Sequence, residues 1–541
     1  MQTVALVLAL LLAVTLSRSL ARLTRCPLPL VQIGLGVLFA LGPLPSVELE
    51  PEIFFLVLLP PLLFIDGWRI PKRDLFRDGR LIVALAIGLV IFTVVGMGYF
   101  IHWMIPAMPL AVAFALAAVL SPTDPVAVAS VASSAPIPRR LMHILEGESL
   151  FNDASGLVCL RFAILAATTG SFSLSEAAAS FVWLAVGGIA VGVLGTFAVT
   201  QLQRVLTAHI GEDGGTLTLL SLLIPFGVYL LAEAIGGSGI LAVAAGGVAM
   251  SFVEAGGRAQ ALTRMRRTAV WDTVELAANG AIFVILGEQL PRIVQDATAT
   301  IGADGSGALT LVLYVVAINL VLVLLRFLWV WATVHVVRIR LRFMKMEART
   351  VSPQLVLATT LAGVKGTVTL AGILTLPVVL ADGSPFPARN LAIVLAMSVI
   401  LSTLLIATVL LPPILSHLRL EAEADDDERL AFEASGAAAR QAIEAKHDLL
   451  LKDGGDAELL AEAAARALHR YERREGGAGT DDATVARARH IRRAARELQL
   501  AGLEAERRSL FTLLRRRQVD DGVVRRLVRQ VDLLEARLRE D

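Results

Sequence analysis

The residues best suited to chemistry in this chain are ionisable side chains inside long apolar segments. The densest group is Glu146–Asp153, at the start of the apolar run 148–169. On a helix, Ser149 and Asp153 share one stripe, whereas Glu148 and Asn152 share the neighbouring stripe. A charge near the centre of a lipid bilayer costs about 2.5–3.5 kcal/mol, so each of these acids needs a partner, water or a function.

A second polar group lies in the segment 121–125, which reads Ser-Pro-Thr-Asp-Pro. A dehydrated monovalent cation takes several oxygen ligands, and these could be carbonyls near Thr123, the Asp124 and Asp153 carboxylates and the Ser149 hydroxyl. Such a site would bind Na⁺, Li⁺ or K⁺. Because burial disfavours the charged form of a carboxylate, a proton could replace the cation on Asp153. The alternative for Asp153 is an acid favoured by the macrodipole at a helix N-terminus.

Basic residues in apolar segments also need partners. Arg326 and Glu148 could form a buried ion pair that joins their two helices without touching a substrate, and removing either residue would strand a charge. Lys365 stands between Gly363 and Gly366, where a continuous helix would be weakest. The remaining ionisable residues in or near the apolar runs are Asp66, Arg161, Glu233, Asp272, Glu275 and Glu288.

The composition of the 541-residue chain is that of a membrane protein, with 56% hydrophobic and 18% charged residues and a mean hydropathy of +0.69. The net charge of +1 gives no reason to expect a nucleic-acid partner. Two distant cysteines, Cys26 and Cys159, give no disulfide scaffold and are interpreted as packing residues. No cofactor is predicted; lipid is the expected surrounding.

Thirteen apolar runs are long enough to span the bilayer. They are 3–22, 28–45, 52–67, 81–103, 109–132, 148–169, 177–200, 216–235, 237–253, 271–291, 306–335, 353–381 and 389–416. One set of alternate loops holds twenty Lys and Arg against two, Arg292 and Arg389, in the other set. Because cytoplasmic loops are enriched in Lys and Arg, the N-terminus is predicted outside and the C-terminus in the cytoplasm.

Thirteen spans can be divided into two repeats of six joined by one linking span. The odd number of spans before the second repeat would give it the opposite orientation in the membrane, as in transporters with inverted repeats. The segment 121–125 and the Lys365 region then occupy corresponding spans. Prolines remove backbone donors and glycines weaken helices, so both spans are predicted to be broken helices. A simple kink in each helix is the alternative. The predicted fold class is therefore all-α and polytopic, with two inverted six-helix repeats, a pair of broken helices and a cytoplasmic tail.

Two domains are predicted, a membrane domain at 1–416 and a soluble tail at 417–541. The tail holds 24 of the 49 Lys and Arg and 26 of the 48 Asp and Glu. Its apolar residues have helical spacing, as in Leu510, Leu513 and Leu514, and glycines at 454–455 and 476–479 would separate the helices. A helical hairpin or a dimer-stabilising coil is favoured over a sensor of an unknown ligand or partner.

The motifs together resemble the monovalent cation:proton antiporter-1 family of sodium/proton exchangers, which includes the bacterial NhaP-type antiporters and their animal relatives. The resemblance is carried over the membrane domain by the segments 59–64, 121–125, 147–153, 237–242 and 363–366, together with Arg326. It implies a homodimer built from a dimerisation domain and a mobile core, whose two broken helices cross at the ion site, and a role in pH homeostasis.

The resemblance also implies roles for individual residues. Asp153 would be the cation- and proton-binding carboxylate, Asn152 its supporting neighbour, and Asp124 with the Thr123 backbone co-ligands. Glu148 and Arg326 would be the structural ion pair. The family usually has Arg where this chain has Lys365, and many relatives carry an acid one position before Asp66, so the roles of both residues stay open.

The pair Asn152-Asp153 bears on stoichiometry, because electrogenic relatives have Asp-Asp there. With one titrating acid in the pair, electroneutral one-for-one exchange of Na⁺ or Li⁺ for H⁺ is predicted. K⁺/H⁺ exchange is the nearest alternative. An intramembrane protease using Ser149 with His143 nearby is a remote one, since rhomboid-like enzymes need glycine where Leu150 stands. A membrane sensor that signals through its tail is another.

Overall fold

The computed structural model describes most of the membrane domain and short parts of the tail. The described residues are 2–24, 26–42, 56–70, 79–131, 137–169, 174–210, 213–254, 261–301, 307–343, 352–380, 383–417, 437, 440–449, 451–452, 457–458, 460–461, 464, 503, 530–535 and 537–538. The chain divides into two compact units, Met1–Leu420 and Glu421–Asp541. In the second unit, residues 440–449 and 530–535 are helical. The glycine segments 454–455 and 476–479 and the leucines at 510–514 lie outside the described residues.

Every named element of the described residues is a helix, which confirms the all-α prediction, and one isolated β-bridge joins Val379 to Pro385. The helices are α1 (Gln2–Thr24), α2 (Leu28–Ala40), α4 (Leu59–Arg69), α6 (Gly79–Val83), the π-helix η1 (Ala84–Leu89), α7 (Val90–Met104), α8 (Leu110–Leu120), α9 (Pro125–Val131), α10 (Arg139–Thr169), α11 (Leu174–Ile210), α12 (Gly214–Ala234), α13 (Gly239–Glu254), α14 (Ala261–Ile301), α15 (Gly307–Phe343), α16 (Pro353–Leu361), α17 (Thr367–Leu374) and α18 (Arg389–Ser416).

Eight helical segments among the described residues are long and apolar enough to cross a membrane. The other five predicted spans coincide with helices that are shorter or broken, namely α2, α4, α8 with α9, α13, and α16 with α17. Thirteen crossings and an inverted repeat therefore stay predictions. Helices α11, α14 and α15 run well past their predicted ends, because a helix can continue through polar residues beyond the hydrocarbon layer.

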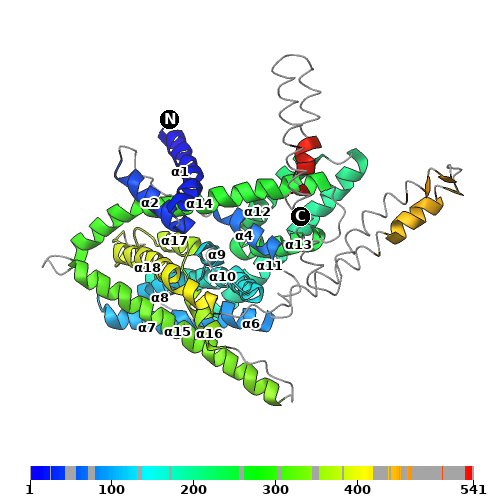
Figure 1. Ribbon diagram of the computed structural model, residues 1–541. Coiled ribbons are helices and arrows are strands. Elements are labelled where there is room, and N and C mark those ends of the chain that lie inside the picture. The colour runs from blue at the N-terminus through cyan, green and yellow to red at the C-terminus, as the bar shows by residue number, and fades with distance from the viewer. Residues whose placement is uncertain are drawn as a thin grey trace. The chain divides into compact units, whose positions relative to one another are not determined.

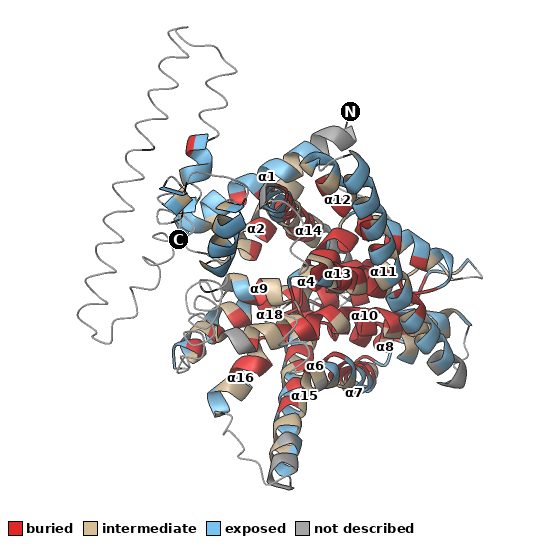
Figure 2. Cartoon of the chain, turned by 90° about the vertical axis from the view of Figure 1, so that its right-hand side faces the viewer, coloured by how far each residue is buried: buried red, intermediate tan, exposed pale blue. Residues whose placement is uncertain are grey.

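The helices of the membrane unit pack as two groups. Helices α1, α2, α4 and α11 to α14 contact one another and form the first helix group; α6 to α10 with η1, and α15 to α18, form the second helix group. The long helices α14 and α15 lie on opposite sides of α18 (Figure 1), and both contact it. In Figure 2 α8 and α10 are largely buried, whereas α11 is largely exposed, as expected for a helix that faces lipid.

Candidate cation site

The helix predicted to break at 121–125 ends as α8 at Leu120 and restarts as α9 at Pro125. Pro125 is the first residue of α9, where its missing N–H costs nothing. Asp124 caps this helix, since its Oδ1 accepts from the N–H groups of Val126 at 2.9 Å and Ala127 at 3.2 Å. The helix therefore restarts with Asp124 as its cap and a proline as its first residue, and the backbone of residues 121–124 lies outside any helix.

The second predicted break separates α16, which ends at Leu361, from α17, which begins at Thr367. The two breaks meet, because the Asp124 N–H donates to the Val364 carbonyl at 2.8 Å. The Lys365 ammonium donates to the carbonyls of Ser121 and Pro122, at 3.1 Å each. Lys365 thus neutralises the carbonyl end of the facing half-helix, as a cation at a helix C-terminus does.

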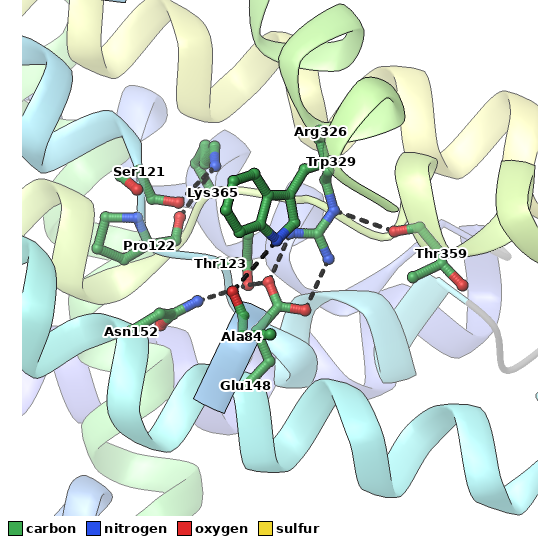
Figure 3. A network of polar contacts seen from close by, with 10 residues as sticks. All are labelled: Ala84, Ser121, Pro122, Thr123, Glu148, Asn152, Arg326, Trp329, Thr359 and Lys365. Atoms are coloured by element: carbon green, nitrogen blue, oxygen red, sulfur yellow. Dashed lines mark hydrogen bonds and ion pairs between the residues drawn. The ribbon is translucent and has the colours of Figure 1, made fainter. Parts of the chain in front are cut away.

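Glu148 and Arg326 form a buried, two-point ion pair (Figure 3). Arg326 Nη1 lies 2.5 Å from Glu148 Oε1 and Nη2 lies 2.9 Å from Oε2, and the two residues are 6% and 1% exposed, respectively. Arg326 Nε also donates to the Thr359 carbonyl of α16 at 3.0 Å. One guanidinium therefore joins α15, α10 and α16, which fork geometry allows and an ammonium would not.

The same acid holds the first break in place. Thr123 Oγ1 donates to Glu148 Oε1 at 3.2 Å and accepts from Asn152 Nδ2 at 3.0 Å. Glu148 and Asn152, on neighbouring turns of one stripe of α10, therefore both act on the Thr123 side chain (Figure 3).

The π-helix η1 anchors α15 next to this ion pair. Trp329, one turn after Arg326, donates its indole N–H to the Ala84 carbonyl at 3.2 Å. A side chain at Gly88 would overlap the Trp329 ring. The indole bond and the close packing at Gly88 together hold α15 against the π-helix.

A cavity lies where the breaks face α4 and α14. It has an empty volume of about 420 Å³, part of which opens to solvent. Its lining consists of Leu59, Leu62, Leu63, Asp66, Pro122, Thr123, Asp124, Pro125, Val126, Ser149, Asp153, Asn279, Gly366, Val368 and Thr369. Three carboxylates in one small cavity, Asp66, Asp124 and Asp153, make it suited to a cation and to protons.

The predicted site residues divide into two sets. Asp153, Asp124, Thr123 and Ser149 line the cavity, and no hydrogen bond joins the Asp153 or Ser149 side chain to another described residue. Asn152, Glu148, Arg326 and Lys365 do not line it; each is held by the contacts given above. The charges Arg161 and Glu233 pair with each other at 3.0 Å, between α10 and α12.

Two polar cavity residues had no assigned role from the sequence. The sequence pattern assigns no role to Asp66, and the structure places it in the cavity wall, on α4. Asn279 lines it from α14 and lies between alanines and a glycine, with no motif around it. An isolated polar residue in an apolar stretch was the available signal, and it is weak.

Gly366 gives a test of the contact between the two breaks. A Cβ atom there would overlap the Asp124 carboxyl group, which is part of the cavity wall. We expect Gly366→Ala to push the breaks apart, to lower the stability by about 1–3 kcal/mol as overpacking does, and to reduce cation flux because the Asp124 carboxyl is displaced. Gly227→Ala is the matched control, since nothing lies within 4 Å of a Cβ at that position. Equal cation flux in both variants would contradict this packing argument.

Paired helix breaks around a buried acidic cavity in a polytopic membrane protein are features of secondary ion transporters. Residues 7–417 match the family model described as sodium/hydrogen exchanger, transmembrane. The chain belongs to this family of cation/proton antiporters, which are transporters rather than enzymes.

Relatives and a solved structure agree with this family. The chain is 37% identical over 547 residues to a protein of Escherichia coli (strain K12) named uncharacterized Na⁺/H⁺ exchanger YjcE, covering 99% of this chain and 98% of the relative. It is 38% identical over 498 residues to a sodium, potassium, lithium and rubidium/H⁺ antiporter of Bacillus pumilus, covering 91% and 72%. The sodium/proton antiporter MjNhaP1 of Methanocaldococcus jannaschii shares the fold, with a TM-score of 0.59 at 20% identity over 77% of this chain and 99% of that one.

Proposed function

We propose that the chain exchanges Na⁺ or Li⁺ for H⁺ across the membrane by alternating access, with Asp153 as the carboxylate that the two ions share. The observation that carries this proposal is the position of Asp153. It is 6% exposed, lines the cavity and makes no hydrogen bond to another described residue. An acid without a structural partner in an apolar body needs a mobile ion to balance its charge.

The surrounding residues are proposed to share the work. Ser149, the Thr123 backbone and Asp124 act as co-ligands of the cation. Asn152 orients Thr123, and Glu148 with Arg326 holds the helices around the break. The Lys365 ammonium donates to two carbonyls of the first break, and we propose that its charge stabilises that break and does not bind the transported ions.

Exchange is proposed to be electroneutral, with one cation for one proton. Asn152 cannot titrate, and its amide nitrogen donates to the Thr123 hydroxyl. Purified protein in proteoliposomes should therefore give the same cation-driven proton flux when valinomycin and K⁺ set the membrane potential to zero or to an inside-negative value. Flux that changes with voltage would show that a second acid, such as Asp66 or Asp124, also carries a proton.

K⁺/H⁺ exchange is the second candidate, because two Bacillus relatives at 38% identity are named for sodium, potassium, lithium and rubidium. The cavity ligands are oxygens for either ion, so cavity size and flexibility decide between them. Dose–response curves for Na⁺, Li⁺, K⁺ and Rb⁺ in the same vesicles separate the two candidates.

The chain is a multi-pass membrane protein with bacterial relatives. We further propose an inner-membrane homodimer with its N-terminus outside, in which 1–416 is the transport domain and the cytoplasmic tail 417–541 stabilises or regulates the dimer. Dimers of a chain ending at Leu420 should then dissociate at a higher protein concentration than dimers of the full chain, or the pH dependence of exchange should shift. Unchanged dimerisation, measured by light scattering, together with an unchanged pH profile would remove the proposed role of the tail.

A further inference from the structure

The cavity has a polar wall that the two breaks do not supply. From the first helix group, α4 contributes Asp66 and three leucines, and α14 contributes Asn279. Asn279 is half-buried, and no hydrogen bond joins its side chain to another described residue. An uncommitted amide at the edge of an ion cavity is available to a ligand.

We propose that Asn279 is a cation ligand, whose amide oxygen completes the coordination of an ion bound at Asp153. This inference rests on the proposed cation exchange and adds to it a ligand from the opposite helix group. The ion would bridge α10 of the second helix group and α14 of the first.

The oxygens of the second helix group are mostly engaged elsewhere. The carbonyls of Ser121 and Pro122 accept from Lys365, and the Thr123 hydroxyl is held between Glu148 and Asn152. Asp124 Oδ1 caps α9. Among the side chains of this group that line the cavity, Asp153 and Ser149 make no hydrogen bond to another described residue, and together they offer three oxygens. An alkali cation takes several oxygens to replace its hydration shell, so an oxygen from the opposite helix group would add to these and to the proposed co-ligands Thr123 and Asp124.

The position of Asn279 is fixed by packing on both sides. Glu275, one turn earlier on α14, forms an ion pair with Arg69 of α4 at 2.6 Å. Gly280, the next residue, packs so closely against Val14 of α1 and Gln32 of α2 that a side chain would not fit. A ligand on a helix held in this way stays in place, so it contributes to selectivity as well as affinity.

A neutral amide also gives the proposal a distinctive signature. Because Asn279 does not titrate, its removal should weaken cation binding and leave proton binding at Asp153 unchanged. Loss of a residue that only shaped the fold would instead lower the maximal rate or the stability, with no preference among cations.

The test compares Asn279→Leu, which keeps the size and removes the oxygen, with Asn279→Asp, which keeps an oxygen. Thr273→Leu is the control, because Thr273 is exposed on the same helix and its hydroxyl bonds to the Ala269 carbonyl. In proteoliposomes at fixed pH, Asn279→Leu should raise the half-saturating Na⁺ concentration about tenfold, keep the maximal rate within about twofold and change the Na⁺-to-Rb⁺ ratio. Asn279→Asp should stay near the native half-saturation.

A second readout does not depend on transport. Na⁺ should raise the Tm of the detergent-purified native protein, and the same Na⁺ concentration should raise it less in Asn279→Leu. An unchanged half-saturation in Asn279→Leu, or equal losses in the Leu and Asp variants, would overturn the ligand role while the proposed exchange stands. If the native chain exchanges no cation, the proposed function fails, and the Na⁺-dependent Tm shift alone decides the role of Asn279.

Discussion

Replacing Asp153 with asparagine is expected to reduce cation-driven proton flux in proteoliposomes to the level of empty vesicles. The amide has nearly the same shape but carries no charge and exchanges no proton, so it can hold neither transported ion in turn. Because the Asp153 side chain makes no hydrogen bond to another described residue, the variant should fold and elute as the native protein does. Flux followed with a pH-sensitive dye inside the vesicles measures the effect.

The matched control for this variant is Asp272→Asn, at an exposed acid of α14 that pairs with Arg69 outside the cavity. It should retain most of the native flux, since exposed ion pairs contribute at most about 1 kcal/mol. Substantial flux in Asp153→Asn would move the carrier role to Asp124 or Asp66, the other carboxylates of the cavity.

Replacing Arg326 with alanine is expected to cause the largest loss of stability. The substitution leaves the Glu148 carboxylate, 1% exposed, without its guanidinium, and it removes the contact to Thr359. Stranding a buried charge costs about 3–5 kcal/mol, a large share of the stability of a typical protein. We expect low yield and a strongly lowered Tm, measured by fluorescence-detected size-exclusion chromatography after heating.

A double variant separates the stability that comes from the Glu148–Arg326 ion pair from the stability that comes from packing of the two side chains. In Glu148→Gln with Arg326→Met no charge is stranded, so its loss of stability should be clearly smaller than that of Arg326→Ala alone. The double variant should also keep measurable exchange, because neither residue lines the cavity. If the single and double variants lose the same stability, the ion pair is not what holds α15 against α10.

The sequence predicted the parts of the site that depend on local chemistry. Pro122 and Pro125 lack backbone donors, so a break at that point follows from the chain itself, and the break is present between α8 and α9. The glycines around Lys365 similarly predicted the gap before α17. Charges in apolar helices limited the choice of partners strongly enough to suggest that Glu148 and Arg326 would pair.

The parts that depend on tertiary packing could not be predicted in this way. Asn279 and Asp66 are more than 200 residues apart in the chain, and only the packing of α4 against α14 brings them to one cavity. The pairing of Arg161 with Glu233 likewise depends on how α10 meets α12. The contact of the π-helix at Ala84 with the Trp329 indole also joins residues more than 200 positions apart, so no local pattern predicts it.

Counting protons released when the cation binds tests the central claim most directly. Native protein in weakly buffered detergent solution is titrated with Na⁺ near neutral pH, and proton release is followed with an indicator dye. If Asp153 holds either ion but never both, release should approach one proton per bound Na⁺ and be absent in Asp153→Asn. Na⁺ binding without proton release, or release that persists in Asp153→Asn, would contradict the account.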